Sequence, residues 1–143
     1  MQLFLEAFHR VGQENDSLTC MTINIFRNLL AFDPSSFVHL CNPSSFSALK
    51  EHFQSKNKAT IKQVLLLLSD LIASDDSVLE LVEQMNVLEK IAGNLERVAK
   101  NKLVKQKDCE YLIAHLALLA QLSLLSSWRI DIVKHAILQH VLQ

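Results

Sequence analysis

The chain has 143 residues, the usual length of about one domain, and its 50% hydrophobic and 20% charged residues exclude a disordered tail. Two glycines, two prolines and 6% aromatic residues supply too few turn residues for a many-stranded sheet, so the composition predicts an all-α fold. The net charge of -1 excludes a global field that would attract nucleic acid or an anionic membrane.

The first predicted element is a helix over 18–32, with Ser17 as its N-cap. Apolar residues cover most of its circumference, so we expect this helix to pack on more than one side. The Asp-Pro dipeptide at 33–34 ends it, because the residue before a proline is forced out of the α region. A short helix over 37–41 and a further helix over 45–54 follow, so one unit contains a long, a short and a medium helix.

The same order of elements recurs 42 residues later without a gap. The segment 28–31 aligns with 70–73, and the apolar positions of the 45–54 helix meet apolar positions again. The next offset is 51, which aligns Leu71 with Leu122. We predict a single domain over 1–143 that is built from repeats. These are a partial repeat over 1–12 and repeats over 17–54, 59–97 and 109–142, with a basic insertion over 98–107.

Three segments, IFRNLLAFDPS (25–35), LLSDLIASDDS (67–77) and LLAQLSLLSSW (118–128), resemble the third-helix pattern of the armadillo/HEAT repeat superfamily. The resemblance implies an armadillo-like right-handed α-solenoid of about three repeats, whose third helices line a concave groove. It also implies that an amide side chain in the middle of each third helix binds the backbone of an extended peptide. Asn28 matches that position, whereas the equivalent residues Asp70 and Gln121 depart from asparagine.

Helical spacing supports a groove independently of the resemblance. Polar or small residues form a strip on helices that are otherwise too apolar to face water. The candidate groove residues are Asn24, Arg27, Asn28, Lys62, Leu66, Ser69, Asp70 and Gln121. The alternative interpretation of the strip is a solvated surface without a partner.

A second candidate site is the basic segment that follows the second repeat. Its cations are Arg97, Lys100, Lys102, Lys105 and Lys107. These side chains could bind an acidic ligand or a phosphate backbone, although the segment lacks the aromatic residues that stack on single-stranded bases. The alternative is a solvated loop.

No motif for catalysis is present in the sequence, and no histidine or cysteine spacing fits a metal site, so we expect neither an enzyme nor a metal or other cofactor. His115 interrupts an apolar helix expected over 111–125. We predict a core histidine bonded to a backbone carbonyl. That helix is too short to span a membrane. Three cysteines without a CxxC pair favour an intracellular protein, in the cytoplasm or the nucleus.

The function that these features predict is that of a non-enzymatic scaffold, which binds a partner peptide or a protein helix in the concave groove. Binding of nucleic acid or an acidic ligand through 97–107 is the alternative. Self-association through exposed repeat ends remains open. Because Leu29, Leu71 and Leu122 occupy matched positions of the three repeats, we predict that all three are buried.

Overall fold

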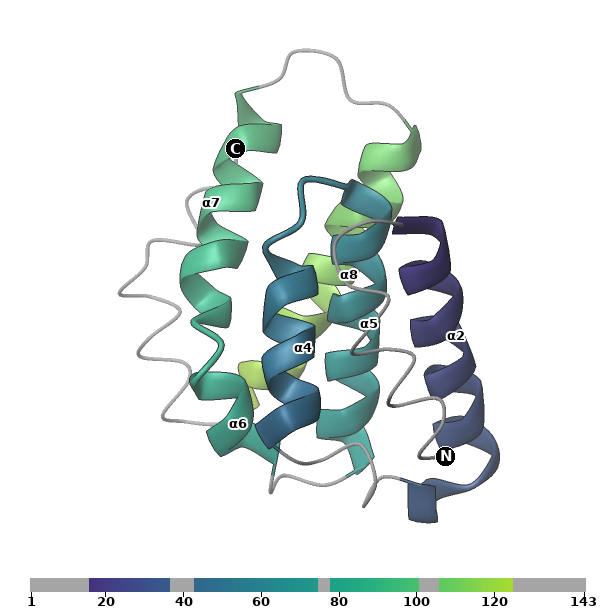
Figure 1. Cartoon of the computed structure of the whole chain (residues 1–143). Helices are drawn as coiled ribbons and strands as arrows, with labels where there is room; N and C mark the ends of the chain where they lie inside the picture. The colour runs from purple at the N-terminus through teal and green to yellow at the C-terminus, as the bar shows by residue number, and fades with distance from the viewer. Residues whose placement is uncertain (1–15, 37–42, 75–77, 101–105, 125–143) are drawn as a thin grey trace. The chain divides into compact units, whose positions relative to one another are not determined.

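The computed structural model describes residues 16–36, 43–74, 78–100 and 106–124. Within these ranges the chain forms six α-helices and one 3-10 turn, with no strand, which confirms the all-α prediction there (Figure 1). The elements are α2 (Asp16–Phe32), η1 (Pro34–Ser36), α4 (Pro43–Phe53), α5 (Lys58–Ser74), α6 (Leu79–Glu83), α7 (Val87–Ala99) and α8 (Gln106–Leu122). The chain divides into two compact units, Met1–Met85 and Asn86–Gln143.

Both ends of α2 are set by short polar residues. The helix begins at Asp16, so Ser17 lies inside it and the predicted N-cap was wrong. The Oδ1 atom of Asp16 accepts a hydrogen bond from the Thr60 hydroxyl (2.9 Å), which joins the start of α2 to α5. The predicted end is confirmed, because α2 stops at Phe32. Asp33 there accepts hydrogen bonds from the backbone N–H and the hydroxyl of Ser35, which lower the pKa of Asp33.

The buried side of α2 differs from the predicted one. Thr19, Ile23, Phe26 and Leu30 are buried, because they lie three or four residues apart on one face of the helix. Leu29 is only half-buried, so the prediction of its burial was wrong. The neighbouring apolar residues of the same helix are exposed, and α2 is therefore not packed on all sides.

The first unit is organised around α5, which lies between α2 and α4 (Figure 1). Nine of its seventeen residues are buried, including Leu67 and Leu71, so this helix loses more apolar surface to the core than α2 does. The burial of Leu71 confirms the prediction for this position. On its other side, α4 contributes Phe46 and Phe53 to the same core.

The helix bounds give a register for the predicted repeats. The first and last residues of α5 each lie 42 residues after those of α2, in agreement with the predicted offset. The bounds of α8 lie 48 residues after those of α5, not 51. Leu122 is buried, as predicted, but it is the last residue of α8 and does not correspond to Leu71 in this register.

In the second unit, α7 and α8 pack against each other. A strongly one-sided apolar pattern in α7 buries Leu88, Ile91 and Leu95. The connection between the helices runs from Lys100 to Lys105, so it is shorter than the predicted insertion over 98–107. The predicted repeats over 1–12 and 109–142, and the short helix over 37–41, lie wholly or partly outside the described residues.

Candidate functional site

Two predicted groove residues, Arg27 of α2 and Asp70 of α5, bind each other. The Nε atom of Arg27 donates a hydrogen bond to Oδ2 of Asp70 over 2.7 Å. Both side chains are partly exposed, so this ion pair stabilises the fold by no more than about 1 kcal/mol. Its main consequence is geometric, because it fixes the edge along which α2 and α5 meet.

The predicted strip continues on α2 beyond this ion pair. Asn24 and Asn28 are exposed, as a groove residue must be, and each offers an amide that can both donate and accept hydrogen bonds. Four residues separate them, which places them on one face of the helix, one turn apart. These two asparagines are the predicted residues best placed to contact a partner.

The part of the strip on α5 is less open. Lys62 and Leu66 are half-buried. Ser69 is buried, and its hydroxyl donates to the backbone oxygen of Leu65 over 3.0 Å. Ser69 therefore does not lie on an exposed groove surface, contrary to the prediction.

Gln121 belongs to α8, in the second unit. Its side chain is half-buried, and its Oε1 atom is buried without a hydrogen-bond partner in the described part of the chain. In the register of the helix bounds, Gln121 corresponds to Ala73 and not to Asp70. A ladder of Asn28, Asp70 and Gln121 stays a prediction, and Gln121 is its weakest member.

Beside the two asparagines, α2 exposes a row of large apolar residues that we call the α2 apolar stripe. Its members, with their exposed fractions, are Leu18 (48%), Met21 (63%), Ile25 (38%) and Phe32 (90%). Steps of three, four and seven residues place them on one side of the helix. Exposed apolar residues that gather in a row mark interaction surfaces more often than isolated ones do. The stripe was not among the predicted site residues, because the sequence pattern indicated that it was packed.

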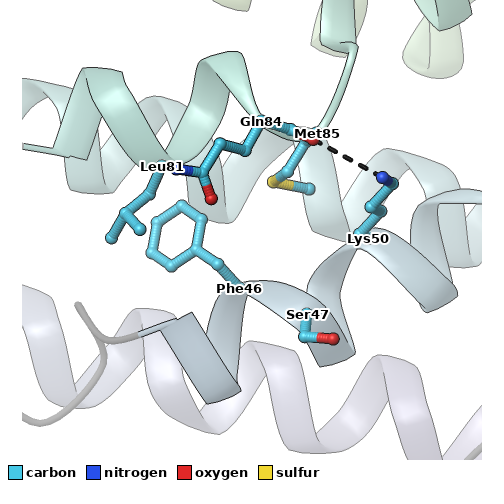
Figure 2. Close-up of a pocket in the computed structure, with 6 residues that line it drawn as sticks. All are labelled: Phe46, Ser47, Lys50, Leu81, Gln84 and Met85. Atoms are coloured by element: carbon cyan, nitrogen blue, oxygen red, sulfur yellow. Dashed lines mark hydrogen bonds between the residues drawn. The ribbon is translucent and has the colours of Figure 1, made fainter.

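A shallow cavity of about 210 Å³ lies between α4 and α6, within the first unit. Phe46 and Met85 form its buried apolar part, and Figure 2 shows the Phe46 ring beside Leu81. At its opening, the ammonium group of Lys50 donates to the backbone oxygen of Gln84 (3.5 Å), as the dashed line marks (Figure 2). The one cation at this cavity is thus already engaged with the backbone.

The predicted basic segment is described in part. Arg97 lies in α7, where its guanidinium donates to the backbone oxygen of Gly93 and to Oδ1 of Asn94. Lys100 pairs with Glu96 over 2.8 Å. Lys102 and Lys105 lie outside the described residues, and Lys107 falls in the first turn of α8. The two described cations with placed side chains are both used within α7.

The second unit contains a continuous chain of polar contacts that ends at His115. Because a carbonyl oxygen only accepts, Nδ1 of His115 carries the hydrogen that it donates to the Tyr111 oxygen (2.7 Å). Nε2 is then an acceptor for the Asn94 amide (3.1 Å), and the Asn94 oxygen accepts from Arg97 (3.1 Å). His115 is a fully buried histidine bonded to a backbone carbonyl, as predicted.

This environment keeps the imidazole neutral. Burial lowers the pKa of His115 to about 4, although the hydrogen bond to Tyr111 acts in the opposite direction. The Tyr111 ring packs edge-on against the imidazole, with 4.4 Å between ring centroids, and burial raises the pKa of its phenol. With both nitrogens engaged and no exposed surface, His115 holds α7 to α8 and is not placed to act on a substrate.

Among the described residues, no group of three or more histidine, cysteine, aspartate or glutamate side chains is placed to hold a metal ion. None of the described helices is both long enough and apolar enough to cross a membrane. Comparisons with protein-family models, with curated proteins and with solved structures give no match to this chain.

Proposed function

We propose that the protein is a non-enzymatic scaffold that binds a protein or peptide partner on the outward face of α2. The observation that carries this proposal is the α2 apolar stripe, which lies beside the exposed amides of Asn24 and Asn28. Apolar surface would supply affinity, and the amides would hydrogen-bond the partner and fix its register.

We also propose that α2 and α5 are equivalent helices of successive armadillo-like repeats in a right-handed α-solenoid. Their equal length, their separation of 42 residues at both ends and their packing side by side support this. An intracellular setting, in the cytoplasm or nucleus, agrees with the free cysteines Cys20 and Cys109.

Within this site, Arg27 and Asp70 have a positioning role. Their ion pair links α2 to α5 at the border of the binding face, so the angle of the exposed amides is fixed before a partner arrives. Such preorganisation lowers the entropy cost of binding. Replacement of Asp70 would disturb this link as well as any direct contact, so Asn28→Ala is the cleaner test of the groove.

The test is quantitative capture of partners from cell lysate, followed by measurement of the direct affinity of each captured protein. The full chain is compared with Met21→Glu, which places a charge within the α2 apolar stripe. The control is Ile113→Glu in α8, because Ile113 is exposed to the same extent, 63%, on another helix.

We expect Met21→Glu to remove specific partners and Ile113→Glu to retain them. Asn28→Ala should weaken binding by about 1 kcal/mol, as the loss of one hydrogen bond does. Equal capture by the wild type and Met21→Glu would show that the α2 face is not the binding site.

A further inference from the structure

We infer that the partner seated on the α2 apolar stripe is an amphipathic α-helix that lies parallel to α2, in the way that α2 lies on α5. This inference rests on the proposed function and specifies the class of partner.

The contacts between α2 and α5 define the geometry of such a pair. Near the start of both helices, Asp16 and Cys20 contact the hydroxyl of Thr60, at 2.9 and 3.6 Å. Near the end of both helices, Arg27 contacts Asp70. Since start meets start and end meets end, the two helices run parallel.

The side of α5 that faces α2 has an equivalent on α2 itself. Thr60 contacts α2, and Leu67 and Leu71 follow it at intervals of seven and four residues, so all three lie on the same side of α5. Their exposed fractions are 0%, 1% and 0%. This side of α5 is therefore fully covered.

A shift of 42 residues maps these positions onto α2. Thr60 and Leu67 become Leu18 and Ile25, which are 48% and 38% exposed, and Leu71 becomes the half-buried Leu29. The helix α2 thus exposes the surface that its counterpart α5 uses to receive a parallel helix. The larger apolar side chains on α2, in place of Thr60, increase the area that a second helix would bury.

The chemistry of the expected partner helix follows from the α2–α5 pair. The stripe from Leu18 to Phe32 is about 21 Å long at 1.5 Å per residue, so the partner needs roughly four helical turns. Its facing side should carry apolar residues at intervals of three, four and seven, which fit between the ridges of α2.

One polar contact is also specified. Arg27 reaches Asp70 from α2, and the residue equivalent to Asp70 on α2 is Asn28. Because Asn28 is a neutral amide, its oxygen can accept from a neutral or a charged donor. We therefore expect a long donor side chain, glutamine or arginine, in the last part of the partner helix.

The experiment uses a peptide with the sequence of residues 16–32 as the probe, because α2 is the one helix known to fit this kind of surface. Its own outward residues Met21, Ile25 and Phe32 are replaced by glutamine to prevent self-association, and a fluorophore at its N-terminus reports binding to the full chain by anisotropy. A scrambled peptide of the same composition is the control for unspecific adhesion.

We expect saturable binding that weakens roughly tenfold or more when the full chain carries Ile25→Glu, as for a residue at the centre of an interface. Ile113→Glu should leave the affinity unchanged. A photo-cross-linker at the N-terminus of the peptide should react with α2 near Leu18, and reaction near Phe32 would overturn the parallel arrangement.

Other results separate this inference from the proposed function. If the peptide does not bind while Met21→Glu still abolishes capture of partners, the helix inference fails and the scaffold proposal stands. If the full chain forms a dimer that Ile25→Glu dissociates, a second copy occupies the stripe and the inference is overturned. Binding of the scrambled peptide with equal affinity would also overturn it.

Discussion

His115 shows how a single buried side chain can make the stability of this protein depend on pH. In the folded chain its pKa is about 4, against an ordinary value of 6.5. Because the folded-state pKa is the lower one, the stabilisation is fully present above pH 6.5 and is lost as the pH falls toward 4. The difference amounts to about 3 kcal/mol in the free energy of unfolding.

The prediction is checked by urea unfolding of the wild type and His115→Gln at pH 7 and at pH 4.5. The groups that titrate in both proteins cancel in the comparison, so the wild type should lose more stability on acidification than the variant does. If both proteins lose the same amount, the imidazole of His115 does not carry the dependence.

Asn86 illustrates a constraint on the backbone instead of on a side chain. It has φ 53° and ψ 44°, in the left-handed region, and lies between α6 and α7. Asparagine and glycine tolerate this conformation, whereas a β-branched residue is strained by contact of its Cβ with the backbone. We expect Asn86→Val to lower the free energy of unfolding by about 1 to 2 kcal/mol. Thermal unfolding of Asn86→Gly, which should differ little from the wild type, is the control.

At the scale of the helix, α7 contains a glycine that its conformation does not require. Gly93 has no positive φ, and a Cβ added there would meet the Arg97 guanidinium at 3.8 Å, an ordinary van der Waals distance. Gly93→Ala should therefore stabilise the protein by about 0.5 to 1 kcal/mol, through the lower backbone entropy of the unfolded chain. The reverse exchange at the neighbouring position, Ala92→Gly, should have the opposite effect in the same denaturation assay.

The helix α5 carries the largest share of the first unit's core, so its apolar residues are expected to be the most sensitive to truncation. Leu71 is fully buried, and Leu71→Ala should cost about 2 to 5 kcal/mol in unfolding free energy. Phe32→Ala is the matched control, because Phe32 is 90% exposed and its truncation should change stability by less than about 0.5 kcal/mol. Similar losses for both variants would contradict the described packing of this unit.

The helices were predictable from the sequence because their signals are local. The proline after Asp33 ended α2 where expected, and the 42-residue period fixed both bounds of α5 relative to α2. The buried side of α2 was not predictable in the same way. Apolar residues cover most of its circumference, so the choice between Ile23 and Ile25 as core residues depends on which neighbouring helices are present.

The candidate site was predicted only in part for a similar reason. Spacing placed Arg27 and Asp70 on one strip, but their contact also required that α2 and α5 be parallel neighbours. The same pattern could not reveal that Ser69 bonds to its own helix, because serine accommodates either role. The exposure of Asn24 and Asn28 agrees with the predicted strip, since asparagine has no apolar surface to bury.

For the whole molecule, charge is separated along the chain although its sum is only -1. Six acidic residues and no basic ones occupy 70–89, whereas six basic residues and one acidic one occupy 90–107. Two of those six cations, Arg97 and Lys100, are engaged within α7. This pairing reduces the charge that the basic segment can offer to a phosphate backbone.

The last prediction concerns salt, which separates the two classes of partner. Binding to duplex DNA loses about 0.9 log unit of affinity per tenfold rise in salt for each phosphate neutralised, because bound counterions are released. Binding to the α2 apolar stripe releases no such ions, so its affinity should change little between about 0.05 and 0.5 M salt. The measurements are titrations of the captured partner, and of a labelled duplex of about 20 base pairs, at several salt concentrations. We expect no saturable binding of the duplex near physiological salt, and capture of the partner should survive Lys102→Glu with Lys105→Glu. If that double variant abolishes capture while Met21→Glu does not, the basic segment is the binding site and the α2 face is not.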